Sequence, residues 1–499
     1  MFRHFLQPIL AALLFISAAA PLHGNESLGE MWGTAKAEEK YYPIVDIPIP
    51  TTVPLRPGGL EFLPDGRLAV GTRRGDIYFI KGITASPPAP EFHLFASGQD
   101  EIFSLAWREG AMLATSWGEL TRIRDLDGDE VADSYEALSA GWGYGEYHEF
   151  AFASKPDPRG DIWIALGLSS SYVSNNLFRG WVVRVTPQGE MIPVCSGLRS
   201  PAGVGPDANG TMFTVESQGP WNGCNSLKPV IPGAFLGHPA SYNWYPFTRD
   251  MKAPAVEPAT PSRMATERAR IKELVPPAVL FPYIKMGRSL SGFRLAETGG
   301  KFGPFDGQIF IGDYTQSIIV RATTEKVNGV WQGACYPFRE GLATGIMNVE
   351  FSPQGQLIAG GFTTNRQWPV RGERPFALQR IDWSGITPFE IREIRIQPDG
   401  FVIDFTLPID PATAADTANY KVSTYTHIYH AGYGSPEVDH THPTVTAAEP
   451  AADGMSVRIR LDRITRDHIH DFDLSGVTSR TGEDLLHRKA YYTVNEIPQ

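Results

Sequence analysis

The sequence predicts an all-β protein, a six-bladed β-propeller followed by a small immunoglobulin-like β-sandwich. A unit made of an apolar strand, a Pro/Asp/Gly turn and a second apolar strand recurs within residues 51–385, as in propeller blades. Only residues 264–275 have a convincing helical pattern. After residue 385 the composition changes, and apolar and polar residues alternate as in a sandwich over residues 386–499.

Residues 1–24 have the features of a secretory signal. Arg3 and His4 precede an apolar run at residues 9–20, which ends in small residues. The run is shorter than the roughly 20 residues that a bilayer requires, so a spanning or buried helix is the weaker alternative. We therefore expect an exported protein, periplasmic or extracellular, with no membrane span after signal removal, and a lead-in segment at residues 25–50 before the propeller.

The propeller prediction depends on six repeat units. They begin at Gly59, Ile102, Glu149, Ala202, Phe302 and Asn348. Their average length of roughly 55 residues is slightly above that of common propeller repeats, which suits a ring with insertions. The change near Gly385 predicts a second domain with its own core.

The overall charge argues against some partners. The chain has 44 basic and 55 acidic residues, a net charge of −11, with 42% hydrophobic residues. This balance is that of a globular protein and provides no basic surface for nucleic acid or an anionic membrane. A small, neutral molecule is the expected partner.

Three cysteines, Cys195, Cys224 and Cys335, leave two alternatives open. A Cys195–Cys224 bridge suits an oxidising compartment, and three buried reduced thiols are equally compatible with the sequence. None belongs to a Cys-x-x-Cys-His haem-attachment pattern. Any electron acceptor would therefore be a separate molecule.

A loop of alternating carboxylates predicts a calcium site. Asp125, Asp127, Asp129, Asp133 and Glu136 occupy positions 1, 3, 5, 9 and 12 of a turn. Such spacing directs hard oxygen ligands to one point, with Glu136 placed to close the shell. A solvated acidic turn is the alternative. The expected role of the ion is structural.

Residues 196–239 carry the motifs of the candidate active site. They contain Gly197-Leu198-Arg199-Ser200-Pro201, then Gln218-Gly219-Pro220 after Glu216, and Gly237-His238-Pro239. The order of these steps resembles the quinoprotein glucose and sorbosone dehydrogenase-like propellers, over about residues 54–383.

The resemblance implies an exported sugar or alcohol dehydrogenase. It would bind pyrroloquinoline quinone and Ca²⁺ at the central mouth, with a carbohydrate or alcohol substrate. His148 is similar in position to the family's general base, and its near-neutral pKa suits proton abstraction. Arg199 would bind the anionic cofactor, and backbone groups at Gly219 and Pro220 would help to hold the ion.

Two other function classes remain open. A metal-dependent lactonase or lyase would use Glu61, Glu216, Asp313 or Asn348 as channel ligands. A non-catalytic propeller would bind a carbohydrate or a partner, with the sandwich as a docking module. The C-terminal pairs His440/His442 and His468/His470 could form a transition-metal site, although exposed or interface histidines are the simpler interpretation.

Overall fold

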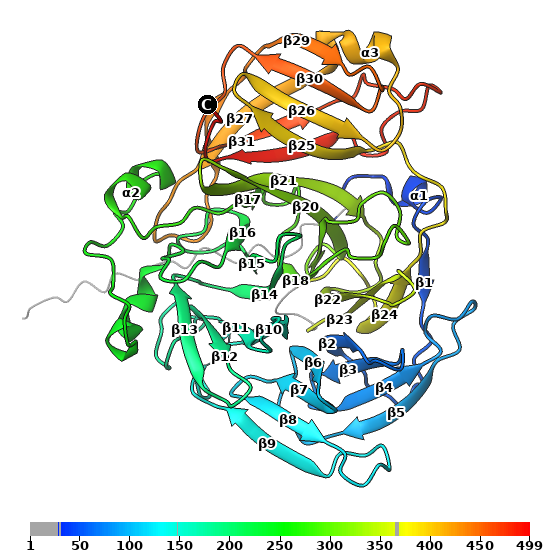
Figure 1. The fold of residues 1–499 in the computed structure, drawn as a ribbon, viewed down its shortest axis with the longest axis vertical. Helices are drawn as coiled ribbons and strands as arrows, with labels where there is room; N and C mark the ends of the chain where they lie inside the picture. The colour runs from blue at the N-terminus through cyan, green and yellow to red at the C-terminus, as the bar shows by residue number, and fades with distance from the viewer. Residues whose placement is uncertain (1–27, 29–30, 147, 365–368) are drawn as a thin grey trace, which may run out of the picture.

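The structure is a computed structural model that describes residues 28, 31–146, 148–364 and 369–499, apart from the side chains of residues 153–155 (Figure 1). The predicted signal segment, residues 1–24, lies outside the described part of the chain. No helix in the described part is long and apolar enough to cross a membrane.

Most of the chain forms antiparallel four-stranded sheets, the arrangement of a β-propeller. In chain order, the strands of these sheets are β2 (Pro57–Phe62), β3 (Leu68–Thr72), β4 (Ile77–Lys81) and β5 (Glu91–Ala96); β6 (Ser104–Arg108), β7 (Ala111–Thr115), β8 (Leu120–Arg124) and β9 (Ser134–Ser139); β10 (Ala151–Pro156), β11 (Ile162–Leu166), β12 (Trp181–Val185) and β13 (Met191–Ser196); β14 (Pro201–Pro206), β15 (Met212–Glu216), β16 (Asn225–Pro229) and β17 (Val279–Phe281); β18 (Leu290–Leu295), β19 (Ile309–Asp313), β20 (Ile318–Val327) and β21 (Val330–Arg339); and β22 (Ile346–Phe351), β23 (Leu357–Phe362) and β24 (Phe376–Ile381).

The sheets close into a ring. Their innermost strands contact one another in the cyclic order β2, β6, β10, β14, β18, β22 and back to β2. The last sheet receives its fourth strand from the other end of the chain, because β1 (Ile44–Asp46) pairs with β24, with Ile44 opposite Ile381. The segment predicted as a lead-in, residues 25–50, thus supplies a strand to the ring.

Local sequence explains the tight turns that join the first two strands in most of the sheets. In Pro64-Asp65-Gly66, between β2 and β3, Gly66 has a φ of +87°, which glycine adopts at little cost. The Asp65 carboxylate accepts the backbone N–H of Arg67 at 3.0 Å. Similar turns join the first two strands in five of the predicted units. The unit at Phe302 contains β19 but not β18, because a long connection separates these two strands.

The C-terminal region consists of two facing sheets. One contains β25 (Ile391–Gln397), β26 (Gly400–Phe405), β29 (Val445–Pro450) and β30 (Ser456–Leu461); the other contains β27 (Lys421–His427), β28 (Glu437–Thr441), β31 (His468–Asp473) and β32 (Lys489–Val494). The helices are α1 (Ala35–Glu38), α2 (Met264–Arg270), α3 (Pro411–Ala415) and the 3₁₀ helices Pro239–Phe247 and Thr417–Asn419.

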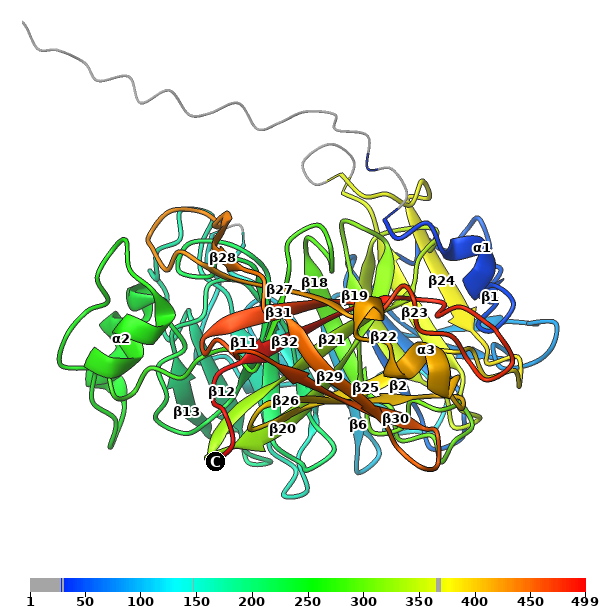
Figure 2. The same cartoon turned by 90° about the horizontal axis from the view of Figure 1, so that it is seen from above.

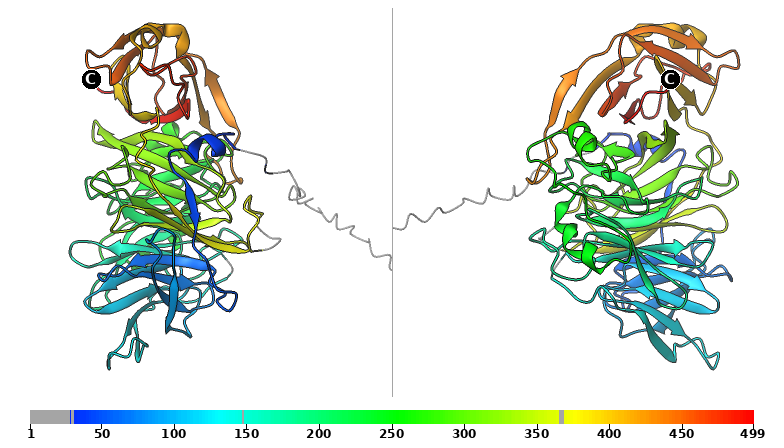
Figure 3. Two further views of the ribbon diagram at one scale, coloured as in Figure 1. Left: turned by 90° about the vertical axis from the view of Figure 1, so that its right-hand side faces the viewer. Right: turned by 60° about the vertical axis from the view of Figure 1, so that its left-hand side comes forward.

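The apolar core of the C-terminal region is built mostly from its own residues, and strands β20 and β21 of the ring add a few more. β32 pairs with β21, so one eight-stranded sheet runs from the ring into the C-terminal region. Ala334 and Tyr336 of β21 belong to the C-terminal apolar core, while Tyr425 and Ile469 belong to a core of the ring. Figure 3 shows the C-terminal sheets (orange to red) seated on the ring, and Figure 2 shows β28 at the end of a long hairpin.

Candidate binding site at the centre of the ring

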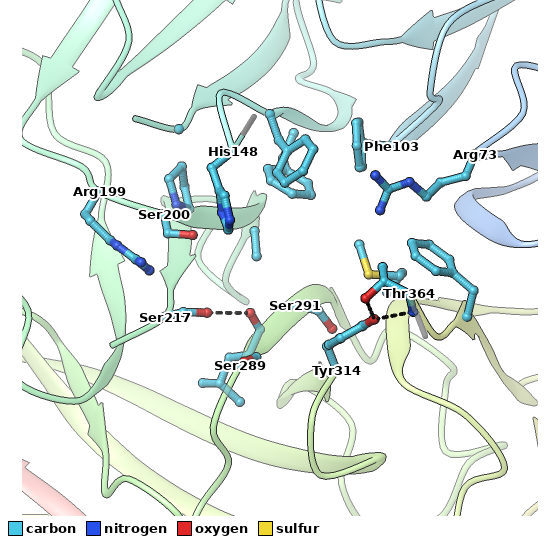
Figure 4. A pocket seen from close by; sticks show the side chains of 18 of the residues that line it. Arg73, Phe103, His148, Arg199, Ser200, Ser217, Ser289, Ser291, Tyr314 and Thr364 are labelled. Atoms are coloured by element: carbon cyan, nitrogen blue, oxygen red, sulfur yellow. Dashed lines mark hydrogen bonds between the residues drawn. The ribbon is translucent and has the colours of Figure 1, made fainter. Parts of the chain in front are cut away.

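A cavity of about 130 Å³ lies where the innermost strands begin. Every sheet of the ring contributes to its lining, and so does the C-terminal region (Figure 4). The lining residues used below are Arg73, Phe103, His148, Phe150, Arg199, Ser200, Ser217, Ser289, Ser291, Tyr314, Phe362, Thr364 and Tyr433. Among the lining residues that the structure describes, none is acidic.

His148, the predicted general base, faces this cavity from the loop before β10. Its φ of +79° lies in the left-handed region, which few non-glycine residues adopt and which is common at functional sites. Burial, and then the nearby cations Arg199 and Arg73, lower the pKa of the imidazole to about 4. His148 is therefore neutral near pH 7 and able to accept a proton.

Backbone strain recurs around the mouth of the cavity. Tyr172, Trp221 and Ile284 have φ values of +60°, +59° and +69°. All three stand in loops at the end of the ring where the cavity opens, and Ile284 is β-branched, for which this conformation is a genuine outlier. Of these residues, Tyr172 contacts the lining residues Arg199 and Tyr433.

Arg199, the predicted anion-binding residue, lines the same cavity and is 5% exposed. Its Nη1 donates to the Gln218 carbonyl at 3.1 Å. The guanidinium carbon lies 4.8 Å from the centre of the Tyr172 ring and 5.2 Å from that of Tyr433. Within the described residues it has no acidic partner at ion-pair distance. The structure thus brings the predicted base and the predicted anion-binding cation into one site.

Arg73 is a second cation of the cavity and already has an acidic partner. It forms a 2.7 Å ion pair with Glu101. Its guanidinium carbon lies within 5.0–5.8 Å of the ring centres of Phe103, Phe150 and Phe362. These rings make one wall of the cavity apolar, so Arg73 contributes positive potential and packing rather than a free anion site.

The rest of the cavity wall is rich in hydroxyl groups. They belong to Ser200, Ser217, Ser289, Ser291, Tyr314 and Thr364. Ser217 donates to the Leu290 carbonyl at 3.3 Å and Ser289 shares a 3.0 Å hydrogen bond with Thr315. The Ser291 hydroxyl is buried without a hydrogen-bond partner among the described residues. Such a wall suits the hydroxyl groups of a small polar ligand.

Gly219 and Pro220 lie behind Arg199 and not in the cavity lining. A Cβ on Gly219 would come within 2.5 Å of the Arg199 Nε, so a larger residue here would displace the Arg199 side chain. Pro220 forms a bridge with Tyr433. Their observed contacts position Arg199 and Tyr433, which differs from the predicted role of holding an ion.

The acidic loop lies away from the cavity. It joins β8 to β9, the outer strands of their sheet, and none of its residues lines the cavity. Oxygens of Asp125, Asp127 and Asp133 lie within 4.8 Å of one another. Asp129 instead accepts the Val131 N–H, and Glu136 pairs with Arg122 at 3.1 Å. The structure therefore gathers three of the five predicted calcium ligands.

The residues considered for a channel metal do not form a cluster. Glu216 accepts the backbone N–H groups of Arg199 and Ser200 and pairs with Lys228. Asp313 accepts the backbone N–H groups of Arg288, Ser289 and Gln316. Neither lines the cavity. In the described part of the chain, the three aspartates of the β8–β9 loop are the only group of three or more such side chains close enough to share a metal ion, and the two C-terminal histidine pairs do not come together in this way.

The cysteines are free and buried, so the Cys195–Cys224 bridge is not formed. Cys195 belongs to β13 and Cys224 to the loop before β16. Burial raises the pKa of Cys195 to about 12. These thiols pack as small apolar groups.

Sequence reasoning missed Tyr172 and Tyr433. The sequence around Tyr433 has the features of a simple turn, and no periodic pattern indicates that it reaches the ring. The sequence offers one signal for Tyr433, a large aromatic residue placed between two glycines in Gly432-Tyr433-Gly434.

Comparisons with known proteins give distant similarities. Residues 89–330 match a family model described as a domain of unknown function, DUF7133. No curated protein matches the chain. A provisionally assigned oxidoreductase (glucose dehydrogenase) of Thermus thermophilus is 18% identical, with a TM-score of 0.48 over 68% of this chain and 99% of that one.

Two further structures are similar at the same level. The pyrroloquinoline-quinone-bound aldose sugar dehydrogenase of Streptomyces coelicolor is 15% identical, with a TM-score of 0.45 over 68% of this chain and 98% of that one. A calcium structure of a Trichoderma reesei carbohydrate-active enzyme of family AA12 is 11% identical, with a TM-score of 0.46 over 69% of this chain and 96% of that one. Similarity at this distance assigns no activity to the chain.

Proposed function

We propose that this chain is an exported, quinone-dependent oxidoreductase that acts on a hydroxyl group of a small carbohydrate or alcohol. The proposed architecture is a six-bladed propeller at residues 51–385, completed by β1, with an immunoglobulin-like sandwich at residues 386–499 and a signal at residues 1–24. One observation carries the functional proposal. A neutral imidazole, His148, and a buried guanidinium without an acidic partner in the described structure, Arg199, line one cavity.

Different side chains of the cavity have different roles in the proposed reaction. A nitrogen of the His148 imidazole accepts the proton of the substrate hydroxyl, as a general base must. The hydroxyl wall orients the substrate, and the phenylalanine wall keeps water from the reacting carbon. When bound, the quinone supplies the acceptor for the hydride that leaves this carbon. A separate molecule then takes up the two electrons.

The residues present fit one carboxylate of such a quinone. Arg199 can bind a carboxylate because its guanidinium has no competing acidic partner among the described residues. A calcium ion at the cavity would receive only uncharged protein oxygens, since no described lining residue is acidic. We therefore propose calcium at Asp125, Asp127 and Asp133, with a structural role.

Reconstitution tests this proposal. The purified protein, incubated with pyrroloquinoline quinone and Ca²⁺, should show the absorption of a bound quinone and reduce a dye with an aldose or alcohol. His148→Ala should lower kcat by roughly 10²–10⁴-fold, the usual range for losing a general base, and leave quinone affinity nearly unchanged. A wild type that binds no quinone would refute the proposal. Ligand binding without turnover would favour the non-catalytic binding propeller.

A further inference from the structure

The C-terminal hairpin between β27 and β28 reaches into the central cavity. Tyr433, near the tip of this hairpin, is 52% exposed and lines the cavity together with ring residues. Its ring centre lies 6.1 Å from that of Tyr172, on the loop after β11. Arg199 contacts both rings. One wall of the cavity therefore belongs to the C-terminal region.

Backbone hydrogen bonds fix the hairpin on the ring. The N–H of Trp221 donates to the His430 carbonyl at 2.8 Å, and the N–H of Gly434 donates to the Gly219 carbonyl at 3.2 Å. Ser435 donates to the Gly223 carbonyl at 3.0 Å. A Cβ on Gly434 would lie 2.6 Å from the Gln218 side chain, so this position requires glycine. Three backbone hydrogen bonds thus join the hairpin to the loop after β15.

A second set of contacts holds the base of the hairpin. Tyr429 and Ser262 exchange two backbone hydrogen bonds of 2.8 and 3.1 Å. The Tyr429 ring lies 5.0 Å from the Trp221 ring in an edge-to-face arrangement, and its hydroxyl donates to the Gly237 carbonyl. Tyr433 is thus positioned by contacts on both sides and cannot swing away without breaking them.

The wall formed by Tyr172 and Tyr433 contacts and positions Arg199. A guanidinium at 5% exposure without an acidic partner in the described structure is costly, because burial removes its hydration. Two tyrosine faces offset part of this cost through cation–π attraction. Their ring centres lie 6.1 Å apart, so the two rings pack on adjacent sides of the guanidinium and not on its opposite faces, while Gln218 accepts one N–H at 3.1 Å. The remaining edge is left for an anion, for which a carboxylate has the matching fork geometry.

We propose that the C-terminal domain completes the ligand-binding site, in which Tyr433 and Tyr172 pack against Arg199 and leave part of its guanidinium facing a carboxylate of the ligand. This inference rests on the proposed function for the role of the cavity as the ligand site. The carboxylate belongs either to the quinone or to the substrate, which would then be a sugar acid. Tyr433 is a positioning residue that acts through Arg199.

Calorimetric titration of the full chain tests the inference with two carboxylate probes, pyrroloquinoline quinone and D-gluconate, and D-glucose as the neutral comparison. The wild type should bind at least one carboxylate probe. Tyr433→Ala should weaken that binding roughly 10-fold, between the values for an exposed and a desolvated cation–π contact. Tyr433→Phe keeps the ring and should bind like the wild type. Arg199→Gln should weaken binding roughly 10- to 100-fold, as expected for a lost charge-assisted hydrogen bond.

The control is Tyr135→Ala, which removes a surface tyrosine of β9 far from the lining residues and should bind like the wild type. Binding of D-gluconate alone would support the inference and refute the quinone. Binding of the quinone with equal affinity by wild type and Tyr433→Ala would overturn the inference and leave the proposed function standing. Binding of neither carboxylate probe would overturn the inference. Folding of each variant is checked by its melting temperature.

Discussion

At the scale of single residues, the cavity combines a strained backbone with an unusual charge state. His148 holds a left-handed conformation, which costs about 1–3 kcal/mol and persists only because neighbouring packing enforces it. Its imidazole also lies in the positive electrostatic potential of two arginines. The burial and the positive potential disfavour the protonated imidazole, so His148 faces the cavity as a proton acceptor.

The charge state of His148 predicts the pH dependence of the reaction. Burial, then Arg199 and Arg73, lower its pKa to about 4, so the acid limb of kcat/KM should fall near pH 4 and not near 6.5. Arg199→Gln removes a nearby positive charge and should shift this limb toward higher pH. Measurement of kcat/KM from about pH 3.5 to 8 checks the shift. An acid limb near 6.5 in the wild type would contradict the assignment of His148.

The same pKa has a consequence for stability. Between pH 6.5 and about 4, the unfolded chain binds a proton at His148 that the folded chain does not. The free energy of unfolding should therefore decrease as pH falls through this window.

At the scale of elements, the β8–β9 loop shows what an acidic turn does in the structure. Asp125 accepts the N–H groups of Gly128 and Glu130 at 2.7 and 2.9 Å, and Asp133 accepts that of Leu126 at 2.7 Å. These bonds order the turn, while three carboxylates remain close enough to repel one another. A divalent cation would relieve this repulsion.

Calcium should therefore raise the melting temperature of the wild type, and Asp127→Asn should remove most of the increase. The matched control is Asp129→Asn, because Asp129 lies in the same loop but outside the group of three. Thermal melts with and without about 1 mM Ca²⁺, the Kd of weak extracellular calcium modules, measure the effect. An equal response in wild type and Asp127→Asn would exclude this loop as a calcium site.

Elements with strong local signals were predictable from the sequence, and those that depend on distant partners were not. Turns such as Pro64-Asp65-Gly66 mark strand pairs because their chemistry is local. β1 was not predicted as part of the ring, since its pairing with β24 leaves no local pattern. His148 and Arg199 each stand just before a strand pattern that the sequence shows, and these patterns place both residues at the centre of the ring. Tyr433 lies in the C-terminal region and reaches the cavity only because this region packs on the ring.

At the scale of the whole molecule, three distant segments meet at one buried histidine. His487 contacts Glu38 of α1 at 2.9 Å and Glu390, at the start of the C-terminal region, at 2.6 Å. Glu38 also pairs with Arg339 of β21 at 3.0 Å. The cluster thus joins the N-terminal segment, the ring and the C-terminal sheets through charges that compensate one another.

The His487 cluster should contribute less to the stability of the fold in alkaline solution. Burial alone would lower the pKa of His487, but Glu390 and Glu38 outweigh it and raise the pKa to about 9. A raised pKa stabilises the fold fully below about 6.5, and this contribution is lost as the pH rises through about 9. The melting temperature should fall between about pH 7 and 9.5, and more steeply in the wild type than in His487→Gln. Parallel curves for the two proteins would contradict this role.

The closure of the ring by β1 also sets an order of events during synthesis. Asp46 bonds to Gln379, 333 residues later in the chain. At about 5–20 residues per second, a ribosome synthesises the partner strand roughly 15–70 seconds after it has synthesised β1. Throughout that interval β1 has no strand to pair with. Ring closure is therefore among the last steps of folding, and a nascent chain that stalls before residue 376 keeps an open sheet edge of the kind that aggregates or recruits a chaperone.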